Sequence, residues 1–385
     1  MKIAIQTIVD YDNYGNRLQN YALQKILEKK KHEVVTLKND FQNPYLPVVQ
    51  SGKNLNKIIH SMRDGSFFIK IRNKIKLRRK LKLINKYQKS RNDAFRRYTD
   101  KYIYESREVF NNDLTNINEL ETFDCFVIGS DQVWNYEFPR FSKFDFLPSV
   151  HQPKISYAAS FGVNSIREDL KKFYKNNLST IEYISVREDK GKEIINELLP
   201  EKEVKVVLDP TLMLSKQEWE NLIAENKTYR QKFVLTYFLD EPTKENQKYI
   251  KKIATENNLE IKQLADVFDE ELWLADPAEF VNLFSQAEMI FTDSFHACVF
   301  SIIFEKYFEI FERNTSLKSM NSRIETLMSN LHTGNRWHRG NSKTLEIPDY
   351  KTINEFLGQK REESFEFLES ALIECQKKIK VEADV

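Results

Sequence analysis

One stretch of the sequence combines a titratable side chain with a turn suited to anion binding. The apolar residues 289–291 lead into Thr292, Asp293 and Ser294, residue types that cap helix N-termini, and a nearly all-apolar segment follows. We interpret this as a buried strand, a tight turn and a buried helix. His296 then lies in the first helical turn, where free backbone N–H groups and the helix dipole favour an anion. An imidazole beside an anion site is typical of a reaction centre; a core histidine bonded to a carbonyl is the alternative interpretation.

The N-terminal segment has the same strand–turn–helix order. Residues 2–9 alternate as a strand, an Asn/Asp/Gly cluster follows, and apolar residues then recur at helical spacing. Residues 33–38 are a second strand, which completes a βαβ unit, and such units bind ligands beyond the carboxyl ends of their strands. We therefore expect Gly15, Asn16 and Gln19 to lie where a ligand binds. Turn chemistry and helix capping are the alternative explanation for these three residues.

Two further strands end in side chains that can bind ligands. The strand at 123–128 is followed by polar groups that can hold hydroxyls and by an indole, and these candidate acceptor-binding residues are Ser130, Asp131, Gln132, Trp134 and Asn135. Trp134 can stack on a sugar ring or fill the core, and both interpretations stay open. Arg187 lies at the end of an apolar strand. A guanidinium there is either paired with a carboxylate or holds a phosphate or carboxylate ligand.

The segment from residue 41 to about residue 115 differs in character from its surroundings. Residues 55–62 mark an amphipathic helix, and residues 70–97 are crowded with Lys and Arg and dotted with apolar side chains. We interpret the segment as a basic helical hairpin inserted into an α/β domain. A solvated helix face is one explanation of the charge. Peripheral docking to an anionic membrane, or to an anionic glycan carrier, through residues 70–97 is the other.

The remaining elements predict an α/β fold with two domains. Two sets of alternating strands and helices, separated near Pro210, indicate two Rossmann-like domains that face each other across a cleft. We assign residues 1–212 to the first domain and residues 213–349 to the second. Residues 350–385 have acids early, lysines late and one apolar face, so we expect a terminal helix that packs back on the first domain.

Composition and missing motifs exclude several classes of function. A net charge of +2 does not indicate a nucleic-acid binder, and no span approaches the ~18 apolar residues of a transmembrane helix. The three cysteines lie far apart without CxxC spacing, which favours a reducing cytoplasm over disulfides or zinc. The motifs GxGxxG, GxxxxGK[ST], HExxH and GxSxG are absent. Asp10-Tyr11-Asp12 is a DxD triplet, but it lies in a turn, and we expect no metal or cofactor.

Six segments, taken together and in order, resemble the polysaccharide pyruvyl transferase family: 13–20, 129–135, 156–162, 185–188, 208–211 and 293–296. They span nearly the whole chain. The resemblance implies a glycosyltransferase-B-like fold and transfer of a pyruvyl group from phosphoenolpyruvate to a sugar of a bacterial surface glycan, as a ketal. It implies that the first domain takes the acceptor and the second the donor. It also implies that His296 is the catalytic acid and that Arg187, Ser294 and Phe295 help to hold the donor.

The chain departs from the family pattern at one position that concerns the donor. Some relatives have an arginine two residues before the histidine, where this chain has Ser294. We expect Arg313, Arg323 or the helix N-terminus alone to hold the phosphate instead. The implied partners are phosphoenolpyruvate as co-substrate and a glycan or lipid-linked saccharide, with a cytoplasmic location that extends to the inner face of the membrane. A nucleotide-sugar-dependent glycosyltransferase and a non-catalytic glycan-binding or membrane-binding relative are the alternatives.

Overall fold

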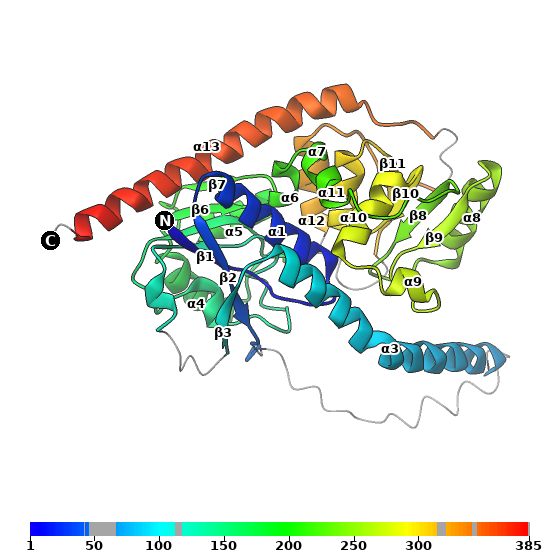
Figure 1. Cartoon of the computed structure of the whole chain (residues 1–385), viewed down its shortest axis with the longest axis horizontal. Coiled ribbons are helices and arrows are strands. Elements are labelled where there is room, and N and C mark those ends of the chain that lie inside the picture. The colour runs from blue at the N-terminus through cyan, green and yellow to red at the C-terminus, as the bar shows by residue number, and fades with distance from the viewer. Residues whose placement is uncertain (42, 46–66, 112–117, 314–320, 341–344, 384–385) are drawn as a thin grey trace.

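The computed structural model describes residues 1–41, 43–45, 67–111, 118–313, 321–340 and 345–383 (Figure 1). Its strands form two separate parallel sheets, one from each half of the chain. The expected α/β class is thereby confirmed. Among the helices in these ranges, none has a stretch long and apolar enough to cross a membrane.

The first sheet has seven strands in the order β3-β2-β1-β4-β5-β6-β7. All neighbours pair in parallel. The strands are β1 (Lys2–Gln6), β2 (Glu33–Asn39), β3 (Glu105–Phe110), β4 (Cys125–Ile128), β5 (Lys154–Ala159), β6 (Tyr183–Val186) and β7 (Val204–Val206). The strand order reverses between β1 and β4. In open parallel sheets this switch point, at the carboxyl ends of the strands, is where ligands bind.

The second sheet has four parallel strands in the order β11-β10-β8-β9. They are β8 (Phe233–Tyr237), β9 (Glu260–Gln263), β10 (Met289–Thr292) and β11 (Tyr307–Ile310). The helices of the two domains and of the segment between them are α1 (Tyr14–Lys29), α4 (Glu168–Leu178), α5 (Asp189–Leu198), α6 (Pro210–Met213), α7 (Lys216–Leu222), α8 (Lys244–Glu256), α9 (Glu270–Trp273), α10 (Pro277–Gln286), α11 (Phe295–Ile303) and α12 (Ser322–Asn330). Two short 3₁₀ helices, Leu120–Thr122 and Lys143–Phe146, lie in the first domain.

The two domains share one hydrophobic core, which joins them along the start of α1. The Tyr14 ring of α1 lies 4.7 Å from the Phe280 ring and 5.8 Å from the Tyr237 ring, both in the second domain. Its hydroxyl donates to the carbonyl of Ala275 at 3.0 Å. The N-terminus of α1 is therefore held against the second domain, and Gly15 with it.

Of the expected helical hairpin, only the basic arm lies in the described residues. Residues 67–102 form one continuous 36-residue helix, α3 (Phe67–Tyr102), because no Gly or Pro interrupts this stretch. Residues 105–110, placed in the insertion by the sequence, form the edge strand β3 of the first sheet. The expected amphipathic helix at 55–62 lies outside the described residues.

The chain ends in a 34-residue helix, α13 (Tyr350–Ala383), which runs along the molecule above the first sheet (Figure 1). Ser364 Oγ accepts a hydrogen bond from the backbone N–H of Leu208 at 3.0 Å. The Arg361 guanidinium donates to the carbonyls of Leu212 and Leu214. These bonds tie α13 to the segment that links the two domains.

Candidate active site

His296 is positioned by the strand–turn–helix unit that the sequence predicts. Strand β10 ends at Thr292, and α11 begins at Phe295. The Asp293 carboxylate accepts hydrogen bonds from the N–H groups of Leu239 and Asp240, at 2.7 and 3.0 Å. Asp293 therefore fixes the turn to the loop after β8. The side chain of the N-cap residue, Ser294, makes no capping hydrogen bond, so first-turn N–H groups of α11 stay available to a ligand.

The imidazole of His296 is buried between the two domains. It is 8% exposed, and its Nε2 lies 3.9 Å from Oδ2 of Asp209. The other side of the ring lies against Gly15, where an added Cβ would be 2.1 Å from Nδ1. Burial lowers the pKa of His296 below its ordinary value, and the carboxylates of Asp209 and Asp131 oppose that shift. The ring at rest is therefore neutral near pH 7.

Arg187 connects the carboxyl ends of three strands of the first sheet. Its Nη1 lies 2.6 Å from Oδ2 of Asp209, after β7, and its Nη2 lies 3.2 Å from Oδ1 of Asp131, after β4. The guanidinium also lies over the Phe295 ring of the second domain, 4.5 Å from its centroid. Burial raises the pKa of Asp209, but the charges of Arg187 and His296 and the hydrogen bonds from Thr211 together outweigh it and bring the value to about 2. The interpretation of Arg187 as an ion-paired group is confirmed, and its role in holding a ligand stays a prediction.

Two more arginines of the second domain lie near this centre, with different partners. Arg313 donates from Nη2 to the carbonyl of Asp293 at 3.0 Å, and its Nε lies 3.5 Å from the Asp293 carboxylate. Arg323 is 5% exposed and makes no hydrogen bond or ion pair with any residue of the described ranges. Its guanidinium lies 5.9 Å from the Phe295 ring centroid. Burial, and then the charge of Arg187, lower the pKa of Arg323 to about 10. A buried guanidinium that makes no direct ion pair is suited to bind an anionic ligand, although the carboxylates of Asp131 and Glu188 act on its charge from further away.

Most of the expected acceptor-binding residues form hydrogen bonds that position the side chains of this centre. They do not line an open pocket. Asn16 donates to the Asp131 carboxylate, which orients the acid toward Arg187. Gln19 donates to Thr7 Oγ1 at 2.9 Å and accepts from the N–H of Ser130 at 3.0 Å. The hydroxyl of Ser130 lies 3.0 Å from Oδ2 of Asp209. Asn16, Gln19 and Ser130 are buried, so they hold the carboxylates in place.

Trp134 fills the core of the first domain, and the expectation that it stacks on a sugar is wrong. Its side chain is completely buried and parallel to the Phe146 ring, with 5.7 Å between the centroids. Its Nε1 donates to the carbonyl of Asp145 at 3.2 Å. The indole therefore has no face left for a ligand.

Gln132 and Asn135 form a hydrogen bond with each other and pack against the turn at Gly162. Asn135 Nδ2 donates to Gln132 Oε1 at 2.8 Å. A Cβ on Gly162, which has a φ of +63°, would lie 2.0 Å from the same Oε1. The pair thus packs on the turn after β5, one strand away from the switch point.

Asp209 is the main site residue that the candidate residues did not include. It contacts the functional groups of both domains, because Arg187, Ser130 and His296 all lie around its Oδ2. Its Oδ1 accepts from the N–H and the hydroxyl of Thr211 at 3.0 and 2.6 Å. A signal was present in the sequence, because Asp209 follows a strand just as Asp131 and Arg187 do.

A cleft lies between α5 of the first domain and α12 of the second. It has a volume of about 470 Å³ and is lined by Asn164, Asp189, Lys190, Glu193, Ser322, Glu325, Thr326 and Ser329. Helix α5 and helix α12 form its walls, and Thr326 Oγ1 accepts from the N–H of Asp189 at 3.3 Å. The cleft residues Asp189 and Ser322 directly adjoin Glu188 and Arg323 in sequence. The His296 and Arg187 side chains do not line the cleft itself.

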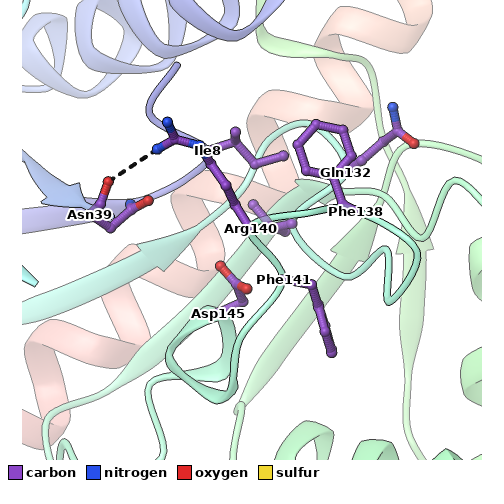
Figure 2. A pocket seen from close by; sticks show the side chains of 8 residues that line it. Ile8, Asn39, Gln132, Phe138, Arg140, Phe141 and Asp145 are labelled. Atoms are coloured by element: carbon purple, nitrogen blue, oxygen red, sulfur yellow. Dashed lines mark hydrogen bonds between the residues drawn. The ribbon is translucent and has the colours of Figure 1, made fainter. Parts of the chain in front are cut away.

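A second pocket lies within the first domain, and Figure 2 shows its lining. Arg140 donates from Nη1 to the carbonyl of Asn39 there, at 3.4 Å. The pocket holds only about 10 Å³, which is room for about one water molecule. It is too small for a substrate.

Three solved structures to which this chain is similar have low sequence identity. UDP-GlcNAc 2-epimerase from Neisseria meningitidis is 12% identical, with 96% of this chain and 94% of that chain covered and a TM-score of 0.40. ADP-heptose LPS heptosyltransferase II from E. coli is 9% identical, with coverage of 94% and 99% and a TM-score of 0.35. A glycosyltransferase from Rickettsia africae is 10% identical, with coverage of 99% and 97% and a TM-score of 0.43. TM-scores this low carry no argument about function.

A search among curated proteins found no match to this chain. The model of the family described as polysaccharide pyruvyl transferase matches residues 13–312, which is most of the 385 residues. The matched range contains His296, Arg187, Asp131 and Asp209, whereas Arg323 lies beyond it. This chain therefore belongs to the polysaccharide pyruvyl transferase family.

Proposed function

We propose that this transferase moves the pyruvyl group of phosphoenolpyruvate onto two hydroxyls of a bacterial surface glycan as a ketal, with His296 as the general acid. One observation carries the proposal. A buried imidazole from the second domain shares Asp209 with the Arg187 guanidinium of the first domain, and an unpaired guanidinium lies beside them. An acid–base group between fixed positive charges suits a small, highly charged donor.

The donor carries a phosphate and a carboxylate, and the buried arginines supply matching groups. Arg323 makes no hydrogen bond or direct ion pair in the described part of the chain, so a bound anion would give its guanidinium a partner. A guanidinium presents a planar fork of N–H donors that matches phosphate and carboxylate geometry. The N-terminus of α11 adds backbone N–H donors, because the side chain of its N-cap residue, Ser294, makes no capping hydrogen bond. We assign the donor phosphate to Arg323 and the α11 N-terminus, because Arg313 is bonded to Asp293.

The first chemical step is protonation of the donor by His296. The imidazolium gives a proton to the methylene carbon, which becomes a methyl group and leaves positive charge on the central carbon. A sugar hydroxyl forms a C–O bond to that carbon, and its proton returns to the imidazole. The C–O bond to phosphate then breaks, a neighbouring hydroxyl takes the vacated position, and its proton leaves with the phosphate.

The electrostatics of the site support this use of an imidazole. Burial lowers the pKa of His296 in the free protein, so the ring starts neutral. The negative charges of the bound donor favour the protonated form. The carboxylate of Asp209, 3.9 Å from Nε2, adds to that effect. Donor binding therefore converts the ring to its acidic form.

The cleft between α5 and α12 is the best-supported entry for the acceptor. Its volume of about 470 Å³ is within the ~300–1,000 Å³ of small-molecule sites. Its lining is made of carboxylate, amide, hydroxyl and amine groups, which bond to sugar hydroxyls. The cleft adjoins Arg323 and Glu188 along the chain, so a sugar there approaches the donor from one side.

The test is release of phosphate from phosphoenolpyruvate in the presence of cell-wall glycan. A His296→Ala enzyme should lose ~10²- to 10⁴-fold in rate, the contribution of a general acid. His151→Ala removes an exposed histidine and serves as the control. A thermal-shift comparison of phosphoenolpyruvate with nucleotide sugars tests the donor. Near wild-type turnover by the His296 variant, or stabilisation by a nucleotide sugar alone, would refute the proposal.

A further inference from the structure

The first half of α3 is strongly basic. From Phe67 to Ile84, the first half of this 36-residue helix, the sequence contains eight Lys or Arg residues and no Asp or Glu. In the structure, residues 77–82 are all exposed, and Leu77 and Leu81 are 55% and 51% exposed. Figure 1 shows this half of α3 extending away from both sheets. The charge of this half is therefore presented to the surroundings of the protein.

The apolar and basic side chains lie on different faces of the helix. At 3.6 residues per turn, Leu77, Leu81 and Ile84 form one stripe. Arg78 and Lys80 flank that stripe, one on each side. A helix with exposed leucines between rows of basic side chains is suited to lie in the interface of a membrane.

Four basic side chains on this half of α3 have no counter-ion among the residues that the structure describes. Arg78, Arg79, Lys80 and Lys82 form no ion pair with any residue in the described ranges. An external surface of negative charge would supply the missing counter-charge. Exposed leucines favour a lipid surface over a nucleic acid, because a phosphodiester backbone offers them nothing to bury into.

The second half of α3 holds this surface rigidly to the active site. Arg91, which is 4% exposed, donates to the hydroxyl of Tyr14 at 3.0 Å and to the carbonyl of Asp12 at 2.9 Å. It also donates to the carbonyl of Trp273 in the second domain. Tyr14 adjoins Gly15, which contacts His296. When the first half of α3 contacts an external surface, these bonds therefore fix how both domains lie relative to that surface.

We propose that the first half of α3 docks this protein on an anionic lipid bilayer. Leu77 and Leu81 enter the level of the headgroups, and Arg78, Lys80 and Lys82 bind lipid phosphates. Docking holds the enzyme at the bilayer surface, where saccharides linked to lipid are presented. The docking surface does not depend on the chemistry proposed for His296, so either can fail without the other.

The experiment is flotation of the full chain with vesicles of phosphatidylcholine alone or mixed with phosphatidylglycerol. The wild type should bind only the mixed vesicles, and less at high salt. Replacement of Arg78, Arg79, Lys80 and Lys82 by Gln should weaken binding by at least about ten-fold. The matched control replaces four exposed lysines of α8, namely Lys244, Lys248, Lys251 and Lys252, by Gln and should bind as the wild type does.

A second variant separates lipid insertion from simple charge attraction. Leu77→Ser with Leu81→Ser keeps every charge and should still weaken binding to the mixed vesicles. Circular dichroism of each variant verifies that the fold is retained. Equal binding to both kinds of vesicle, no binding to either, equal losses in the α3 and α8 variants, or no effect of the leucine changes would each overturn the proposal. The last result would indicate adsorption by charge alone, without insertion of the leucines.

Discussion

The contact between Gly15 and His296 makes Gly15→Ala the sharpest test of the site. A Cβ at position 15 would lie 2.1 Å from Nδ1, 2.5 Å from Cε1 and 2.9 Å from Cγ of the imidazole, whereas ordinary contacts begin at 3.4 Å. One methyl group therefore displaces the ring by more than 1 Å. The ring cannot move that far and keep its position beside Asp209, 3.9 Å from Nε2.

The expected result is a loss of activity without loss of the α1 helix. A misplacement of about 1 Å in a catalytic group can cost ~10²-fold in rate, which is the fall in kcat/KM that we expect. Alanine is more favourable than glycine in a helix by about 0.5–1 kcal/mol, so α1 itself is not weakened. Crowding of the core should cost about 1–3 kcal/mol, seen as a lower Tm.

The assay is phosphate release from phosphoenolpyruvate with a glycan acceptor, read together with thermal unfolding. Gly358→Ala in α13 is the matched control, because a Cβ there meets nothing within 4 Å. A double-mutant cycle with His296→Ala supplies the decisive comparison. If Gly15 acts by making room for the ring, Gly15→Ala costs little more once the imidazole is absent. Wild-type activity of Gly15→Ala, or an undiminished loss in the His296→Ala background, would refute the reasoning.

Three further predictions concern the charged groups around the ring. The lowered pKa of His296 in the free protein implies that kcat/KM falls as pH rises through a value below the ordinary pKa of histidine. The bound donor favours the imidazolium, so kcat should fall at a higher pH than kcat/KM does. Profiles of kcat and kcat/KM against pH that coincide would contradict this. Arg323→Lys keeps the charge but loses the fork of donors, so KM for phosphoenolpyruvate should rise about ten-fold or more, against an exposed control, Arg230→Lys. Asp209→Asn weakens a fully buried ion pair with Arg187 and should lower the free energy of unfolding by about 3 kcal/mol in urea titrations; an unchanged midpoint would show that the pair is not needed for stability.

Short-range patterns predicted the local units of this site well. The apolar run, the capping residues and the apolar segment around His296 are each a few residues long, and they form β10, the turn and α11. Strand β6 ends directly before Arg187 for the same reason. Hydrophobic periodicity and turn residues act within the segment that contains them, so they can be interpreted without the rest of the chain.

Sequence patterns are ambiguous where one pattern of residues fits two different structural roles. An indole after a strand suits both a sugar site and a core, and only the packing of Trp134 on Phe146 decides between them. The basic arm of the expected hairpin is a single helix, because nothing between residues 67 and 102 interrupts it, and the other arm lies outside the described residues. The expected ligand-binding residues Asn16, Gln19 and Ser130 have the right polarity, but their burial makes them supports for Asp131 and Asp209.

The sequence by itself determined which groups are present and that each follows a strand: the imidazole, the guanidinium groups and the carboxylates. The tertiary structure alone decided which of them meet. Strand order brings the carboxyl ends of β4, β6 and β7 to one edge of the first sheet. The shared core packs α1 against the second domain, and this packing places Gly15 in contact with His296. Such contacts join residues from opposite ends of the chain, and their energy depends on packing that no local pattern contains.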